Sequence, residues 1–449
     1  MSFSTIILAA GQSIRMQSVL PKMLHKLAST AMIDYVLATT KGLAVGESVI
    51  VVGPKMKMLE DHVQSKDVDI KFAVQKKKIG TADAVKIGLA RLKNSNQNIL
   101  VLYGDVPFVS INTIKKMHIK LLKDSKSALV VLGFEAEDPA HYGRFVINRG
   151  GHLQKIVEFF DCTKSEKHRT LCNSGIMMVR GKHIKQLVSK VKADNAKGEF
   201  YFTDIVGIAL SQGLHCQHII TKEEEVVAVN NRKDLTIAEA IIQRNLRNKF
   251  LLKGVTLIDP NSVYFSMDTV VAKDVTIFPN VFIGPAVKIE TGVQIKSFSH
   301  IEGAIIKKNS IIGPFARIRP GTNLGEGVRV GNFVEIKNSN IASGSKIGHL
   351  AYIGDTKMGR NVNIGAGVIT CNYDGLYKHK TVIKNEAFIG SNVALIAPVS
   401  IGKGALVAAS SAITKNVASC DLAIERTQQK NIKSGAKRIT RKIKSSKLK

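Results

Sequence analysis

The first 230 residues alternate short apolar runs with a longer stretch of helical periodicity. Residues 4–10, 48–52, 98–103 and 127–132 are rich in Ile, Val, Leu and Ala and are predicted to be buried strands. Residues 82–92 repeat their apolar positions with the spacing of a helix. Strands that alternate with helices form a mostly parallel sheet covered by helices. The pattern therefore predicts an N-terminal α/β domain, with ligands bound beyond the carboxyl ends of its strands.

The second half carries an aliphatic residue at every sixth position. A period of six fits neither a helix nor a two-faced sheet, but it fits a parallel β-helix in which each flat side takes one hexapeptide. The six-residue spacing is interrupted at several points and resumes in a different phase, so that the aliphatic positions form separate series. Each such shift of phase predicts a loop that leaves the coil, and residues 372–380 are a candidate. The series are Val275, Val281, Val287 and Val293; Ile306, Ile312, Ile318, Leu324, Val330 and Ile336; Ile341, Ile347 and Ile353; and Ile383, Ile389, Leu395, Ile401, Val407 and Ile413.

Between the two halves, residues 232–252 lack Gly and Pro and predict one charged helix, which would be a rigid connector. The predicted domains are therefore 1–231, this helical linker, 253–426 and a basic tail, 427–449. The end of the chain, residues 425–449, holds ten Lys and Arg against one Glu. We expect the tail to be solvated and disordered, with polyanion binding as the alternative.

Charge and composition narrow the function classes. The chain of 449 residues has 65 Lys and Arg against 35 Asp and Glu, a formal charge of +30 that attracts polyanions. Aromatic residues are only 6% and Trp is absent, which disfavours a dedicated nucleic-acid surface. No apolar run approaches the roughly 18 residues that span a membrane, and the basic start of a secretory signal is missing. Five cysteines without a CxxC pair indicate reduced thiols. We expect a cytoplasmic protein with neither a membrane partner nor a specific nucleic-acid partner.

Two short motifs follow predicted strands. Residues 8–16 contain a glycine turn whose N–H groups could cradle phosphates, while Arg15 and Lys22 would neutralise charge. By spacing alone, an ordinary turn with two surface cations explains this segment equally well. Asp105 follows a strand and precedes Pro107, and a carboxylate at a strand's carboxyl end suits Mg²⁺. A simple turn aspartate is the alternative.

These motifs together resemble a known family, from about Ile6 to Arg426. The N-terminal motifs are similar to those of sugar-phosphate nucleotidyltransferases. With the hexapeptide half, the chain resembles the bacterial bifunctional N-acetylglucosamine-1-phosphate uridyltransferase/glucosamine-1-phosphate N-acetyltransferases. The motifs that carry the resemblance are residues 8–16, 20–24, 80–81, 103–105 and 229–232, then 313–321, 331–337, 348–355 and 363–375.

The resemblance implies a fold and two reactions. The N-terminal domain would be Rossmann-like, and the C-terminal domain a left-handed parallel β-helix. The enzyme would acetylate glucosamine-1-phosphate from acetyl-CoA and then, with Mg²⁺, transfer uridylyl from UTP to N-acetylglucosamine-1-phosphate. UDP-N-acetylglucosamine, a precursor of peptidoglycan and lipopolysaccharide, and pyrophosphate would be the products. A homotrimer with acetyl-transfer sites between subunits would be the working assembly.

For the uridyltransferase half, the resemblance implies a nucleotide and sugar site in which no covalent protein intermediate forms. Arg15 and Lys22 would contact the phosphates as catalytic residues, and Asp105 and Asn230 would hold Mg²⁺. Gln75 would read the uracil together with the Gly80-Thr81 pair. The implied binding residues are Leu8, Ala9, Ala10, Gly11, Lys22, Gln75, Gly80, Thr81, Tyr103, Gly104, Asp105, Gly143, Glu158, Asn173 and Asn230.

For the acetyltransferase half, the resemblance makes His349 the general base, since a neutral imidazole can accept a proton near neutral pH. Glu335 belongs to its surroundings, and Asn372 would face the thioester oxygen. The sugar phosphate would be bound by Arg319, Lys337, Tyr352 and Asn363, and CoA by Ala366, Asn372, Tyr373, Ser391, Ala409 and Arg426.

The chain departs from the family pattern mainly in its first half. Ser13 and Ile14 replace a usual Gly-Thr pair, Lys78 stands where Gln is common, and Phe159 and Phe160 replace polar residues. These changes could weaken nucleotide binding. They leave two alternatives open: an acetyltransferase whose first half binds nucleotide without turnover, and a non-catalytic assembly module that pairs the same two folds.

Overall fold

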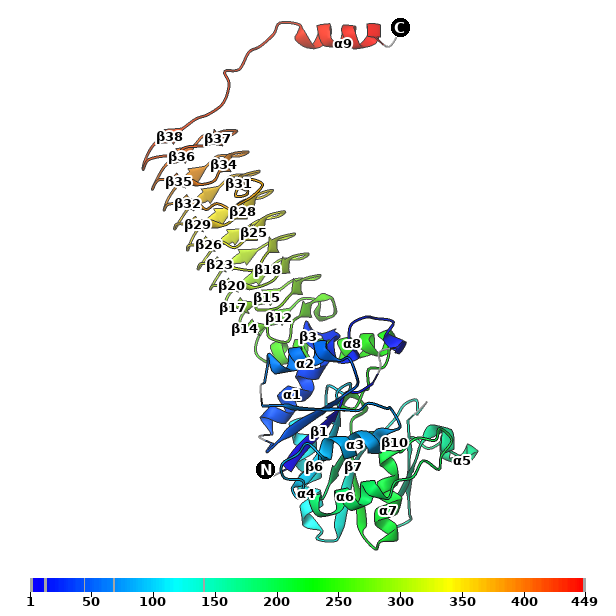
Figure 1. The fold of residues 1–449 in the computed structure, drawn as a ribbon. Helices are drawn as coiled ribbons and strands as arrows, with labels where there is room; N and C mark the ends of the chain where they lie inside the picture. The colour runs from blue at the N-terminus through cyan, green and yellow to red at the C-terminus, as the bar shows by residue number, and fades with distance from the viewer. Residues whose placement is uncertain (1–2, 12–13, 44, 68, 140–141, 447–449) are drawn as a thin grey trace. The chain divides into compact units, whose positions relative to one another are not determined.

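The computed structural model describes residues 3–11, 14–43, 45–67, 69–139 and 142–446. The chain forms two compact units, Met1–Asn245 and Leu246–Lys449, each with its own core (Figure 1). The helix α8 (Arg232–Leu251) crosses the boundary between them in the sequence.

The first unit is built on one mixed sheet. Its strands run in the order β11-β7-β10-β6-β1-β4-β5, with the β8–β9 hairpin attached to β10. Most neighbours are parallel, as predicted, whereas β10 runs antiparallel to β6 and β7. The strands are β1 (Phe3–Leu8), β4 (Ser48–Val52), β5 (Lys71–Val74), β6 (Asn98–Tyr103), β7 (Ser127–Glu135), β8 (Arg144–Ile147), β9 (Leu153–Val157), β10 (Leu171–Val179) and β11 (His215–Thr221), with a small β2 (Lys26–Leu27) and β3 (Thr30–Ala31) hairpin.

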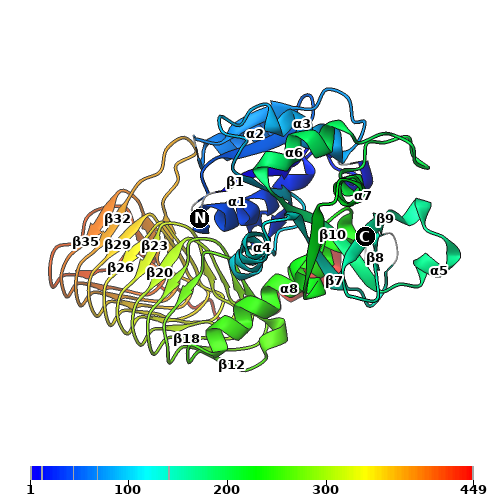
Figure 2. The same ribbon diagram turned by 90° about the horizontal axis from the view of Figure 1, so that it is seen from below.

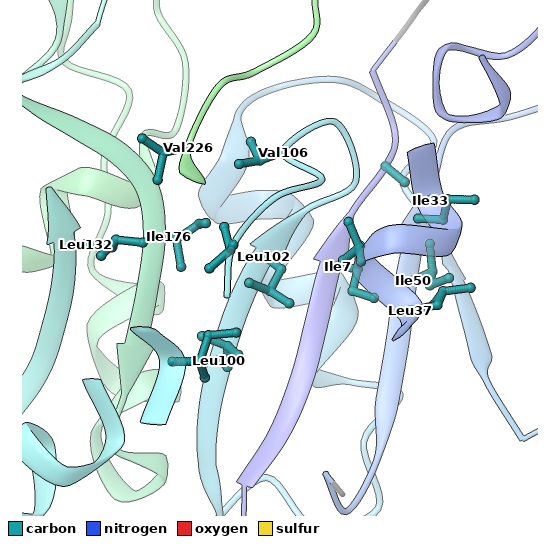
Figure 3. Packing of buried hydrophobic residues seen from close by; sticks show 14 of the residues in the cluster. Ile7, Ile33, Leu37, Ile50, Leu100, Leu102, Val106, Leu132, Ile176 and Val226 are labelled. Carbon is teal, nitrogen blue, oxygen red and sulfur yellow. The ribbon is translucent and has the colours of Figure 1, made fainter. Parts of the chain in front are cut away.

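Helices cover both faces of this sheet because the central strands are apolar on both sides. Ile7 and Ile50 point into one core together with Ile33 of α1, whereas Ile6 and Val49 point into the other (Figure 3). The helices α1 (Met32–Gly42), α2 (Lys57–Gln64) and α4 (Ile111–Lys123) pack on the first face, and α3 (Thr81–Leu89), α6 (Gly181–Ser189) and α7 (Ile205–Ser211) on the second. The short α5 (Lys164–Lys167) follows β9. The α/β prediction is confirmed.

The second unit is a left-handed parallel β-helix of stacked coils, with three sheets as its sides (Figure 2). The first sheet contains β12 (Thr256–Leu257), β15 (Thr276–Ile277), β18 (Gln294–Ile295), β21 (Ile311–Ile312), β24 (Arg329–Val330), β27 (Lys346–Ile347), β30 (Asn363–Ile364), β33 (Phe388–Ile389), β36 (Leu406–Val407) and β38 (Leu422–Ala423). The second contains β13 (Tyr264–Phe265), β16 (Phe282–Ile283), β19 (His300–Ile301), β22 (Arg317–Ile318), β25 (Glu335–Lys337), β28 (Tyr352–Gly354), β31 (Ile369–Cys371), β34 (Ala394–Ile396) and β37 (Ala412–Ile413). The third contains β14 (Val270–Val271), β17 (Lys288–Ile289), β20 (Ala304–Ile306), β23 (Thr322–Leu324), β26 (Asn340–Ile341), β29 (Thr356–Met358), β32 (Thr381–Ile383) and β35 (Val399–Ile401).

The coils differ in length, and this explains the phase shifts. Thr276 pairs with Gln294, eighteen residues on, but Gln294 pairs with Ile311, seventeen on. Asn363 pairs with Phe388, twenty-five on, because residues 372–380 leave the coil. The prediction that phase shifts mark loops is therefore right for this segment and wrong for the step from Ile336 to Ile341, where a corner loses one residue and both side chains stay buried.

The tail contains a helix, α9 (Gly435–Ser446), in which no side chain is buried. Its residues include five Lys and Arg and no acid. A helix of this length without tertiary contacts is marginally stable in water, because most helix stability in proteins comes from packing. The expected disorder of the tail stays a prediction.

Candidate functional site

The carboxyl ends of β1 and β6 bring the two N-terminal motifs together. The strands are parallel neighbours with Leu8 opposite Tyr103, and the Gly104 N–H donates to the Leu8 carbonyl oxygen (3.0 Å). A Cβ at Gly104 would lie 3.0 Å from Met23 Sδ, so this glycine lets the two loops pack closely. The edge of the sheet where ligands bind in this fold is therefore formed by both motifs.

A polar cluster of four side chains lies at this edge. Lys22 is only 7% exposed, and its ammonium forms an ion pair with the Asp105 carboxylate. It also donates to Asn230 Oδ1 (3.3 Å), and Arg15 Nη2 donates to the same oxygen (3.1 Å). The Val229 N–H donates to the carbonyl oxygen of Asp105 (2.9 Å), which holds Asn230 beside the aspartate.

This cluster has the chemistry of a hard-cation site. One carboxylate and one amide oxygen converge on the positive charge of Lys22. Mg²⁺ prefers such oxygens and takes its remaining ligands from phosphate and water. Within the described part of the chain, no group of three or more His, Cys, Asp or Glu residues gathers to hold a metal by itself. A metal bound at Asp105 would therefore share its coordination with a substrate.

Two adjoining cavities open beside the cluster. The smaller, of about 270 Å³, and the larger, of about 830 Å³, share Thr81, Tyr103, Asp105 and Glu199 in their walls. Of the predicted residues, Leu8, Ala10, Gly11, Gln75 and Gly80 line the smaller cavity alone, and Arg15, Gly143, Glu158, Asn173 and Asn230 the larger alone. Two elongated ligand parts, joined near Asp105, would fit this arrangement.

Three predicted residues lie behind these walls. Ala9 is buried under the loop, Gly104 serves the packing of the two strands, and Lys22 contacts the wall residues Asp105 and Asn230. Ser13 lies outside the described residues, and its neighbour Ile14 is 75% exposed.

The wall of the larger cavity includes a half-buried carboxylate, Glu158, with the half-buried Asp204 nearby. Glu158 accepts a hydrogen bond from the Thr203 hydroxyl (3.0 Å), and burial raises the pKa of this carboxyl. Burial, together with the Asp161 charge, raises the pKa of the neighbouring Asp204 to about 6. Burial also raises the pKa of the Tyr103 phenol, so the phenol is a neutral hydrogen-bonding group.

Sequence reasoning missed several residues of these walls. Lys197 lies over the Phe160 ring, 4.3 Å from its centre, and Tyr201 and Thr203 complete the same side. Lys78, which the sequence analysis treats only as a departure, lines the smaller cavity. No motif spacing marks these positions. Lys197, Tyr201 and Thr203 reach the site from a segment about 95 residues after Asp105, and Lys78 reaches it from an irregular segment.

On the β-helix, charged residues from three coils meet on the second sheet. Arg319 donates to Glu335 Oε1 (2.6 Å), and Glu335 pairs with Tyr352 on the next strand. The positive charge of Lys378, in the loop that leaves the coil, lies against Lys337 and lowers the pKa of that ammonium. These two cations, with Arg319, form a positively charged surface that attracts an anion such as a phosphate group. Lys378 was not predicted from the sequence.

Above this group, Asn372 and Tyr352 converge. Both the Tyr352 hydroxyl and the Asn372 Nδ2 lie so near Gly354 that a Cβ there would be 2.6 and 2.8 Å from them. Asn372 is buried and donates to Asp355, which also accepts from Asn338. The side-chain amide of Asn372 is therefore held in one orientation by a buried carboxylate.

His349 stands at the lower end of a column along one corner. The Gly367 N–H donates to the His349 carbonyl (3.2 Å), the Asn392 N–H to Ala366 (2.7 Å) and the Ser410 N–H to Ser391 (2.8 Å). The Ala409 carbonyl then accepts from Arg426 Nη1 (3.1 Å). His349, Ala366, Ser391 and Ala409 thus stack on consecutive coils. The remaining predicted residues are Asn363, half-buried on β30, and Tyr373, exposed at the start of the loop.

The column at His349 adjoins an exposed row of large apolar side chains. Phe298, Phe315 and Phe333 stack with ring centres 4.9 and 5.0 Å apart, and each is about half exposed. Leu350 continues the row, since its N–H donates to the carbonyl of Asn332 on the coil below (3.1 Å). We call Phe298, Phe315, Phe333 and Leu350 the apolar row.

The fold and both sites define a nucleotidyltransferase domain followed by a hexapeptide-repeat transferase domain. The family model of the MobA-like NTP transferase domain matches residues 5–168, and that of the bacterial transferase hexapeptide (six repeats) matches residues 303–338. The chain belongs to the family of the bifunctional protein GlmU. The protein of that name from Zymomonas mobilis is 45% identical, over 98% of each chain. That from Paramagnetospirillum magneticum is 43% identical over 97% of this chain and 96% of its own, and that from Ruegeria sp. 43% over 100% and 99%.

Membership of this family excludes the non-catalytic assembly module left open above. Among the helices in the described ranges, none combines the length and apolar character needed to cross a bilayer.

Proposed function

We propose that this chain is a bifunctional enzyme that acetylates glucosamine-1-phosphate and then uridylates the product to UDP-N-acetylglucosamine. The observation that carries the proposal is the presence of both polar constellations on one chain: Lys22, Asp105 and Asn230 beside two cavities, and Arg319, Lys337 and His349 on the β-helix. Full-length similarity to bifunctional relatives supports the same pairing.

In the first domain, the smaller cavity takes the uridine nucleotide and the larger takes N-acetylglucosamine-1-phosphate. A phosphate oxygen of the sugar phosphate attacks the α-phosphorus of UTP, and the bond to the β-phosphate breaks to release pyrophosphate. Arg15 and Lys22 neutralise the charge on the phosphates, and the walls align the two substrates. Asp105 and Asn230 would hold Mg²⁺, which supplies further charge neutralisation on the phosphate oxygens.

In the second domain, the phosphate of glucosamine-1-phosphate binds Arg319 and Lys337, with Lys378 beside them. The sugar's 2-amino nitrogen attacks the thioester carbonyl of acetyl-CoA, His349 accepts the amine proton, and the C–S bond breaks to release the CoA thiol. Asn372, held by Asp355, donates to the carbonyl oxygen as negative charge develops there. The column of Ala366, Ser391 and Ala409 offers small side chains along which CoA can extend, with Arg426 at its end.

The proposed assembly is a homotrimer that works in the cytoplasm. The exposed apolar row supports an interface beside His349, because contiguous apolar surface on a monomer usually marks a contact. The proposed division of labour places uridyl transfer in residues 1–231 and acetyl transfer in 253–426, with 232–252 between them and 427–449 as a tail.

Two assays on the full-length protein test this function. Pyrophosphate release from UTP, N-acetylglucosamine-1-phosphate and Mg²⁺ should disappear in Asp105→Ala and persist in His349→Ala. Release of the CoA thiol from acetyl-CoA and glucosamine-1-phosphate should show the reverse. If the folded wild-type protein releases thiol but no pyrophosphate, the proposed uridyl transfer is wrong. The chain is then an acetyltransferase whose first domain does not turn over nucleotide.

A further inference from the structure

The smaller cavity contains an amide whose orientation is fixed by the protein. Gln75 is only 4% exposed, and its Nε2 donates to the Gly80 carbonyl (3.1 Å) and to Asp83 Oδ2 (2.9 Å). Both amide hydrogens are therefore used. No described group donates to the Gln75 Oε1, so what this side chain offers to a ligand in the cavity is an acceptor.

Lys78 stands three residues further along the same wall. Like Gln75 it lines the smaller cavity and not the larger one. Its ammonium makes no ion pair or hydrogen bond within the described ranges of the chain. The Lys78 side chain as a whole is exposed, and the part of it that lies against the cavity wall lowers the pKa of its ammonium through partial desolvation. An ammonium can only donate, so the lining of one cavity includes both a fixed acceptor, from Gln75, and a pure donor, from Lys78.

We propose that Lys78 is a specificity-determining residue that selects the pyrimidine base by donating to a carbonyl oxygen while Gln75 accepts from the neighbouring ring N–H. Uracil carries an N3–H donor flanked by two carbonyl acceptors, which complements this pair. Cytosine has an acceptor at N3 and an amino donor at C4. Its N3 would therefore face the acceptor Gln75 Oε1, and its amino group would face the donor Lys78. The inference rests on the proposed uridyl transfer and extends it to the choice of base.

The test compares nucleotides on the full-length protein and its variants. Lys78→Met removes the donor and keeps the length of the side chain. Lys77→Met is the matched control, since Lys77 is exposed like Lys78 but lines neither cavity. Binding of UTP and CTP is measured by calorimetry without sugar phosphate, and kcat/KM for both by pyrophosphate release. We expect Lys78→Met to lower the affinity and the kcat/KM for UTP about tenfold and to leave those for CTP nearly unchanged. The preference for UTP over CTP should therefore fall about tenfold.

Lys78→Gln provides a second readout, because an amide can donate or accept. This variant should keep the affinity and kcat/KM for UTP within a few-fold of the wild-type values and should raise those for CTP, which again lowers the preference for UTP. Lys77→Met should change the values for neither nucleotide. Equal losses for UTP and CTP would overturn the proposal, because they would place Lys78 on the phosphates. No change in Lys78→Met would overturn it as well. If the wild-type protein binds UTP without releasing pyrophosphate, the proposed uridyl transfer fails, and the calorimetric ratio still decides the role of Lys78.

Discussion

Lys22 forms an ion pair with Asp105, 83 positions away in the chain, and the pair lies almost out of contact with water. The two side chains come from different loops that meet because β1 and β6 are parallel neighbours. A buried charge is costly unless it is paired, so the contact between the two side chains offsets the cost of burying each of them beside the two cavities.

Replacing Lys22 by Met should reduce pyrophosphate release by at least about a hundredfold, because the phosphates lose a positioned cation. Acetyl transfer should stay at the wild-type rate. The matched control is Lys26→Met, an exposed lysine four residues on that lines neither cavity. Wild-type pyrophosphate release in Lys22→Met would remove this lysine from the mechanism.

The glycine loop offers a gain-of-function experiment. Ile14 exposes three-quarters of its side chain, so Ile14→Thr should leave the core intact while restoring a hydroxyl donor near the phosphates. Together with Ser13→Gly, which restores the glycine usual in the family, it should lower the KM for UTP several-fold. Glycine adopts a positive φ without the cost of about 1 kcal/mol that a serine would carry there. The measurement is a UTP titration at saturating sugar phosphate. An unchanged KM would mean that neither departure affects nucleotide binding.

The apolar row predicts how acetyl transfer depends on assembly. Phe315→Glu with Phe333→Glu places two charges on an exposed surface, so the β-helix should still fold, but the row can no longer be buried in an interface. Light scattering should then report a smaller species that has lost thiol release and kept pyrophosphate release. A double variant of wild-type mass, or an active monomer, would place the interface elsewhere.

Asp204 predicts a pH dependence of stability. Its pKa is raised to about 6 in the folded protein, chiefly by burial, from the ordinary 3.8. The folded state therefore binds the Asp204 proton more tightly than the unfolded state does. The contribution of this group to the free energy of unfolding is most favourable at low pH and falls as pH rises through about 4 to 6. Asp204→Asn keeps the shape without the charge. After discounting for solvent screening, it should stabilise the first unit by about 1 kcal/mol at pH 7.5 and by almost nothing at pH 4.

Thermal unfolding at the two pH values checks this prediction. Asp69→Asn, at an exposed loop aspartate, is the control and should shift the melting temperature at neither pH. An equal effect of Asp204→Asn at both pH values would show that burial of its charge is not the cause.

Much of the β-helix could be predicted, because its signal is local. Every coil must bury an aliphatic side chain at each side, so Ile306, Ile312 and Ile318 recur at a fixed spacing whatever the rest of the chain does. The five-residue step from Ile336 to Ile341 could not be distinguished from a loop by spacing alone. Its length becomes meaningful only when the neighbouring coil is seen to stay in register.

The residues of the two sites also include some that the sequence could predict and others that it could not. Asp105 was predictable, since an aspartate directly after a buried strand lies at the edge where ligands bind. The contact between Thr203 and Glu158 was not, because it joins segments 45 residues apart whose local sequences carry no shared pattern. Lys78 and Lys378 were missed as site residues for a related reason: lysines are common, and their surroundings decide whether one is solvated or directed at a ligand.

The sequence by itself determined the two-part architecture, the β-helix and the positions of Gly11 and Asp105 just after strands, because hydrophobic period and residue order act over short distances. Only the tertiary structure decided which side chains share a cavity, which amide hydrogens of Gln75 are already used and which cations lack a partner carboxylate. Those properties depend on distances between segments far apart in the chain, and such distances exist only once the sheet and the coils have closed.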